Sequence, residues 1–125
     1  MLDRDGRRVA LRDRYPLHLP EGEPDAVTAC ALSEPGSPFF GVAIPGANGW
    51  QRDGAQRFAG WDVRILVDHD DAGRGLAERL TVDLQPYARE VRVVAWPDVL
   101  GHEPPRGFDL GEYAALMQAP TRVAA

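Results

Sequence analysis

The chain has 125 residues, a formal net charge of −5 and a single cysteine, Cys30, which excludes an internal disulfide and a cysteine zinc cluster. All 14 basic residues are arginine, and the lack of lysine excludes a Walker-type phosphate loop and Schiff-base chemistry. The acidic balance argues against a freestanding basic nucleic-acid module. No apolar run approaches the roughly 18 residues that span a bilayer, and the charged N-terminus has no apolar stretch behind it. We therefore expect a cytoplasmic protein with no membrane partner.

The first half of the chain predicts two strands and two helices. Residues 1–14 are highly charged with little periodicity, which predicts a weak edge strand or a disordered start. Residues 15–20 alternate like a strand, despite two prolines. Pro24 suits a first helical turn and predicts a helix over residues 26–32. Residues 39–44 then form a strand, and a glycine-rich loop leads to a short helix over 51–58.

The second half predicts two more strands, each followed by a helix. Residues 62–67 form the clearest strand, and from Ala72 a helix places Leu76, Leu80, Leu84 and Tyr87 on one face. Residues 91–96 are the fourth strand, and residues 110–117 a closing helix. This alternation predicts a compact, Rossmann-like α/β domain over residues 15–117, with about four mainly parallel strands flanked by helices and a tail at 118–125.

Acidic residues follow the predicted strands. In open α/β sheets, binding sites form beyond the carboxyl ends of the strands. The residues that the sequence places there are Glu21, Glu23 and Asp25 after the first strand, Gly46 to Gly49 after the second, Asp68, Asp70 and Asp71 after the third, and Asp109 after the fourth. Carboxylates gathered in this way repel one another unless a cation joins them, and they suit Mg²⁺ or Mn²⁺.

Asp68 and Asp70 are the centre of this prediction. Two residues apart in extended backbone, they would point to the same side and face one ion, and Gly73 would allow a tight turn into the next helix. The alternative is that Asp70 and Asp71 cap that helix while Asp68 is solvated. Two other folds that place acids after an apolar strand, the haloacid-dehalogenase phosphatases and the receiver domains, normally work with a lysine that this chain lacks.

In order and spacing, three segments resemble the Toprim domain, closest to its primase and primase-helicase branch. They are Leu19-Pro20-Glu21-Gly22-Glu23-Pro24-Asp25-Ala26, Val67-Asp68-His69-Asp70-Asp71-Ala72-Gly73 and Gly107-Phe108-Asp109-Leu110. The resemblance covers residues 15–117 and implies a Toprim-like sheet with Mg²⁺- or Mn²⁺-dependent phosphoryl or nucleotidyl transfer on DNA, RNA or nucleotides. Pro20 departs from the family pattern, in which a small apolar residue precedes the glutamate, and predicts a distorted strand end.

The resemblance also implies roles for individual residues. Glu21 would be the general acid/base and, with Asp68 and Asp70, the catalytic metal site; Asp25 and Asp109 would be auxiliary ligands. A helicase, a primase N-terminal domain or another replication protein would be the partner. Two alternatives stay open: a non-catalytic Toprim-shaped module that binds nucleic acid or a replication partner, and a component of a Toprim nuclease.

Other residues are candidates for binding phosphate or nucleic acid. Arg74, at a helix start, and Arg52 are candidate phosphate contacts, together with Gly46 and Gly49 of the glycine-rich loop. We expect His69, between the two aspartates, to point away from the metal face and to have a packing or surface role.

Overall fold

The computed structural model describes residues 10–22, 40–42, 44 and 49–118. The predicted helix over 26–32, Glu23, Asp25, Cys30 and Gly46 lie outside the described residues. In chain order, the elements are α1 (Leu11–Arg14), β1 (Leu17–Pro20), β2 (Phe40–Gly41), the 3-10 helix η1 (Arg52–Phe58), β3 (Asp62–Leu66), α3 (Asp71–Leu84), β4 (Glu90–Val93), α4 (Trp96–Leu100) and α5 (Leu110–Gln118).

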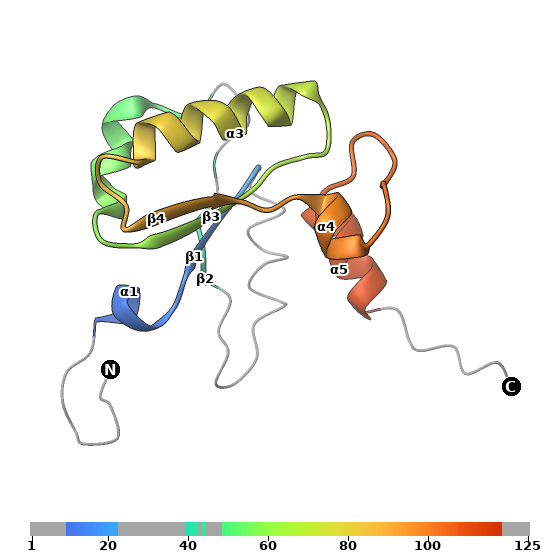
Figure 1. The fold of residues 1–125 in the computed structure, drawn as a ribbon, viewed down its shortest axis with the longest axis horizontal. Coiled ribbons are helices and arrows are strands. Elements are labelled where there is room, and N and C mark those ends of the chain that lie inside the picture. Colours follow the sequence, from blue (N-terminus) through green and yellow to red (C-terminus); the bar gives the residue numbers. More distant parts are fainter. Residues whose placement is uncertain (1–9, 23–39, 43, 45–48, 119–125) are drawn as a thin grey trace, which may run out of the picture.

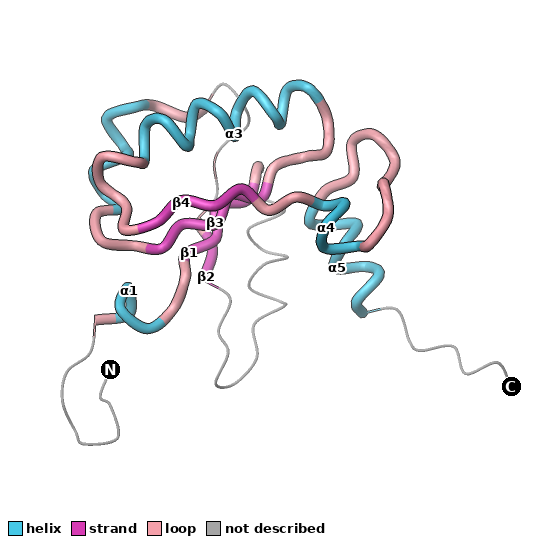
Figure 2. Tube along the Cα trace, in the orientation of Figure 1, coloured by secondary structure: helices cyan, strands magenta, loops and turns pink. Residues whose placement is uncertain are grey.

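The strands form one parallel sheet with the order β2-β1-β3-β4 (Figure 2). β1, β3 and β4 make up its body, and in the described part of the chain β2 adds two residues at the edge. Figure 1 shows α3 lying along one side of the sheet, with α4 and α5 together beyond the end of β4. The expected mixed α/β fold, with a small parallel sheet flanked by helices, is confirmed. Among the described residues, every helix is too short or too polar to cross a bilayer.

The main core lies between α3 and the sheet. Leu76 and Leu80 of α3 are fully buried against a sheet face that includes Leu19 and Ile65. Each fully buried leucine contributes about 2 kcal/mol of transfer free energy. Tyr87 was predicted on the same helix face but is 47% exposed, because α3 ends at Leu84.

A second, smaller core joins the end of β3 to the C-terminal helices. It contains Leu66, Trp96, Phe108 and Leu110. Trp96 was predicted as the last residue of a strand, but β4 ends at Val93 and Trp96 begins α4. The reason is packing: the indole turns inward and is only 3% exposed, whereas an extended backbone would have carried the chain on along the sheet edge.

β1 runs through Pro20 without the distortion that we expected. Pro20 keeps its register with Leu66, and its carbonyl accepts a hydrogen bond from the amide of Ile44 at 3.2 Å. That bond shows that the backbone polar groups of Pro20 face β2 rather than β3. The missing N–H of proline therefore falls on the side where pairing is short, and the β1–β3 ladder stays intact.

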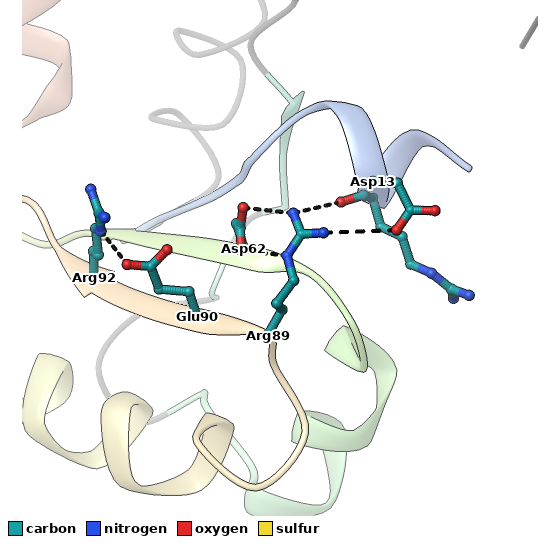
Figure 3. A network of polar contacts seen from close by, with 6 residues as sticks. Asp13, Asp62, Arg89, Glu90 and Arg92 are labelled. Atoms are coloured by element: carbon teal, nitrogen blue, oxygen red, sulfur yellow. Dashed lines mark hydrogen bonds and ion pairs between the residues drawn. The ribbon is translucent and has the colours of Figure 1, made fainter. Parts of the chain in front are cut away.

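Arg89 ties the beginnings of β3 and β4 to α1 (Figure 3). Its guanidinium donates to both carboxylate oxygens of Asp62, at 2.9 and 2.7 Å, and to the carbonyl of Arg12 at 3.4 Å. Asp13 lies 3.8 Å from the same group. The prediction of a weak edge strand or disordered start was wrong for Leu11–Arg14, where a helical turn brings these acceptors to Arg89.

Candidate acidic site at the ends of β1 and β3

Glu21 and Asp68 lie side by side, just past the ends of neighbouring parallel strands. The amide of Glu21 donates to the carbonyl of Leu66 at 3.0 Å, which continues the β1–β3 ladder. One carboxylate oxygen of Glu21, Oε2, accepts a hydrogen bond from the amide of Asp68 at 3.1 Å. Because an ionised acceptor strengthens a hydrogen bond, this contact orients the Glu21 carboxylate toward Asp68.

The residue after Glu21 is a glycine because its backbone has a positive φ. Its φ of +88° lies in the left-handed region, which other residues rarely adopt. The amide of Gly22 donates to the carbonyl of Ile44 at 2.7 Å. The chain can therefore turn away directly after Glu21 while the glutamate stays at the strand end.

The strand order places Glu21 and Asp68 where open α/β sheets usually bind ligands. β1 lies between β2 and β3, so the chain leaves β1 toward one edge of the sheet and leaves β3 toward the other. The boundary between β1 and β3 is thus the topological switch point of the sheet, where open α/β folds bind ligands. Glu21 and Asp68 are at the carboxyl side of this boundary.

Asp70 has a structural role at the start of α3. It is the N-cap residue, and its Oδ1 accepts a hydrogen bond from the amide of Gly73 at 2.7 Å. The prediction of extended backbone from Asp68 to Asp70 was wrong: the amide of Asp70 donates to the carbonyl of Asp68 at 2.9 Å, so the chain bends at His69. This bend takes the chain from the strand into the capped helix. Strand geometry therefore does not place the side chains of Asp68 and Asp70 on the same side.

Gly73 is required for close approach. The structure gives it no positive φ, so the turn that we expected is not the reason for glycine at this position. A Cβ at Gly73 would lie 2.1 Å from the carbonyl oxygen of Asp68, far inside van der Waals contact. The first turn of α3 therefore packs directly on the backbone of Asp68.

The loop that carries Asp109 is also fastened to this segment. His69 donates from its amide to the carbonyl of Phe108 and accepts at its own carbonyl from the amide of Gly107, both at 2.8 Å. The His69 imidazole, at Nε2, lies 2.6 Å from Oε1 of the exposed Glu103. His69 thus pairs with a surface residue, and its expected orientation away from a metal stays a prediction. Asp109 accepts from the amide of Glu112 at 2.8 Å, one turn into α5.

The two predicted arginines, Arg74 and Arg52, lie in different places, and a third, Arg106, joins Arg74. Arg74 is 3.1 Å from Asp71, and Arg106 is 4.0 Å from the same carboxylate. Arg52 lies on η1, 3.9 Å from Asp83 of α3. Only Arg74 and Arg106 border the acidic segment.

Two hollows adjoin the acids. One of about 260 Å³ has mainly apolar walls and lies between Asp68–Asp70 and residues 93–97 at the end of β4. Another of about 270 Å³ is lined by Asp70, Asp71, Arg74 and Arg106, among others. Gly49 instead lines a larger hollow of about 540 Å³ beside η1. Asp70, Asp71, Arg74 and Arg106 therefore share one region, which Asp68 adjoins. Arg52 and Gly49 lie elsewhere, on and beside η1.

Within the described part of the chain, no group of three or more His, Cys, Asp or Glu side chains is arranged to hold a metal ion. Comparisons of the chain with protein-family models, curated proteins and solved structures find no match.

Sequence reasoning missed three residues that shape the site: Trp96, Phe108 and the partner of His69, Glu103. Trp96 donates from its indole N–H to the carbonyl of Val67 at 2.9 Å. The only signal in the sequence was the Gly107-Phe108-Asp109 segment, which pointed to Asp109 rather than to the backbone of Phe108. Contacts made by main-chain atoms leave little trace in residue type.

Proposed function

We propose that this chain is a Toprim-like catalytic domain that carries out Mg²⁺- or Mn²⁺-dependent phosphoryl or nucleotidyl transfer on nucleic acid. One observation carries the proposal: the carboxylate of Glu21 is hydrogen-bonded to the amide of Asp68 at the switch point between β1 and β3. This brings together the first acids of two segments that lie 47 residues apart in the chain. The proposal combines this geometry with the Toprim resemblance of the sequence.

The donor chemistry fits a hard divalent cation that keeps much of its water. Mg²⁺ is usually held through one or two carboxylates, with waters and substrate phosphates completing its shell. Asp68 and Glu21 would be the two carboxylates that hold it, and water and substrate phosphate would complete its shell. When bound, the ion would supply charge neutralisation at the phosphate that reacts.

The residues of the chain itself would orient the reactants and move a proton. Glu21 is held at Oε2 by the amide of Asp68, and we assign it the acid/base role. Arg74 and Arg106 share Asp71 in ion pairs whose side chains are all at least 67% exposed. Such surface pairs contribute little stability, so a phosphate group can replace Asp71 as the partner of both arginines.

A second candidate function is a non-catalytic module that binds nucleic acid or a replication partner. It is favoured by the roles of Asp70 and Asp109, which cap α3 and α5. Two of the predicted ligands would then be present for helix stability alone.

An assay of nucleotide addition to an oligonucleotide, with Mg²⁺ or Mn²⁺ present, separates the two functions. The variants are Asp68→Asn, which removes a ligand charge, and Asp70→Ser, which keeps a good N-cap but removes a carboxylate. The catalytic proposal predicts that Asp68→Asn lowers the rate at least about a hundredfold and that Asp70→Ser lowers it while unfolding like the wild type.

Equal rates for the wild type and Asp68→Asn would overturn the catalytic proposal. A wild type that binds the oligonucleotide without adding nucleotides would also overturn it and support the module. Asp70→Ala serves as the stability control, because it loses the cap and should unfold about 1 kcal/mol more easily.

A further inference from the structure

The peptide group that joins Val67 to Asp68 is held at both ends. Its carbonyl, from Val67, accepts the indole N–H of Trp96 at 2.9 Å. Its N–H, from Asp68, donates to Oε2 of Glu21 at 3.1 Å. A peptide group is planar and rigid, so the direction of its carbonyl sets the direction of its N–H. The indole of Trp96 therefore sets the orientation of the group that Glu21 binds.

Trp96 is well placed to act as a fixed donor. Its ring packs edge-on against Phe108, with centroids 5.3 Å apart, and against Tyr113 at 5.5 Å. Only 3% of Trp96 is exposed, and Val67 is also buried. A hydrogen bond in such surroundings does not compete with water, and leaving the Val67 carbonyl unpaired there would be unfavourable.

The same aromatic group holds the other side of Asp68. The carbonyl of Phe108 accepts from the amide of His69 at 2.8 Å. The backbone is thus fastened one residue before Asp68 and one residue after it, and both fastenings come from the second core.

We propose that Trp96 is a positioning residue, which holds the Val67–Asp68 peptide so that Glu21 and Asp68 face each other. Its importance for a reaction rests on the proposed function, whereas its effect on the peptide does not. In this role Trp96 acts through the main chain, at the carbonyl of Val67.

Trp96→Phe tests this role, because phenylalanine keeps an aromatic ring but lacks the indole N–H. The matched control is Trp50→Phe. Trp50 also donates an indole hydrogen bond, at 2.8 Å to Asp83, but it lies beside η1, away from the Val67–Asp68 peptide. Two measurements are made on the full chain: hydrogen exchange of individual amides by NMR, and the affinity for Mn²⁺ alone.

We expect the Asp68 amide to exchange about fivefold faster in Trp96→Phe than in the wild type, as the loss of one hydrogen bond predicts. This factor is taken after division by any change in the exchange rate of Leu80 in α3, which reports a general loss of stability. Mn²⁺ binding should weaken about tenfold, as is typical when a group that orients a ligand is removed. Trp50→Phe should change neither the relative exchange of Asp68 nor the Mn²⁺ affinity.

The results separate this inference from the proposed function. If Asp68 exchanges in Trp96→Phe as it does in Trp50→Phe, the positioning role is overturned. If Asp68→Asn binds Mn²⁺ as the wild type does, the metal-dependent function is overturned, while faster exchange of Asp68 in Trp96→Phe would still support the positioning of the peptide by Trp96.

Discussion

At the scale of single residues, Gly73 shows how the helix and the acids depend on each other. Its amide caps onto Asp70, and its missing side chain lets α3 approach the carbonyl of Asp68. Any side chain here would have to push the strand end and the helix apart. The position of Asp68 relative to α3 therefore depends on glycine at residue 73.

Gly73→Ala and Gly75→Ala form a matched pair for this idea. Both add one methyl group to the first two turns of α3, but a Cβ at Gly75 meets no atom within 4 Å. Gly75→Ala should raise the free energy of unfolding by up to about 1 kcal/mol, because alanine favours the helix. Gly73→Ala should lower it by about 2 kcal/mol through overpacking. Urea denaturation measures both, and equal stability of the two variants would contradict the close approach.

The sequence predicted which residues follow the strands, but it did not predict the path of the main chain between them. The acids after β1 and β3 were predicted to gather around one ion. The structure joins the Glu21 carboxylate to the backbone amide of Asp68, and the shared ion stays a prediction. The extended path from Asp68 to Asp70 was wrong, because the need to cap α3 bends the chain at His69. Capping and metal binding use the same residue types, so the sequence leaves the role of Asp70 open.

At the scale of elements, the Asp62–Arg89 pair joins β3, the turn before β4 and α1. The hydrogen bonds from Arg89 are the main cause that lowers the pKa of Asp62 below its usual range. A carboxyl whose pKa is lowered by folding stabilises the folded state above its unfolded pKa. That contribution is lost as the pH falls through the folded pKa.

Asp62→Asn should therefore be less stable than the wild type at pH 7, and the difference should shrink as the pH falls below about 3.9, the ordinary pKa of aspartate. The measurement is the urea midpoint as a function of pH. Glu78→Gln, at an exposed position on α3, controls for the loss of one negative charge. A difference between Asp62→Asn and the wild type that stays constant down to pH 2 would contradict this linkage.

Elements with a strong period could be predicted, and elements made by tertiary contacts could not. The leucine spacing of α3 and the apolar run of β3 are local patterns, and both elements were found within a residue of their true starts. α1 has no such pattern, and its contacts are with Arg89, which lies 77 residues further along the chain from Arg12. α4 is short and begins with a tryptophan that a strand would equally favour.

At the scale of the whole molecule, the strand order decides where chemistry can occur. The sequence predicts parallel strands but not that β1 and β3 are neighbours with a switch point between them. Once β1 and β3 pair, two acids that lie 47 residues apart in the chain come into contact. The second core then holds the backbone on either side of Asp68 through Trp96 and Phe108, so the candidate site depends on both cores of the molecule.

The central claim is that Glu21 and Asp68 form one divalent-metal site. The most direct test is a Mn²⁺ titration of the wild type, Glu21→Gln, Asp68→Asn and the double variant. Both substitutions keep the size of the side chain, and glutamine can still accept the Asp68 amide.

We predict that each single variant binds Mn²⁺ at least about tenfold more weakly than the wild type. In the double variant the loss should be smaller than the two single losses combined, because both residues act on one ion. Wild-type affinity in either single variant, or losses that simply add, would contradict a shared site.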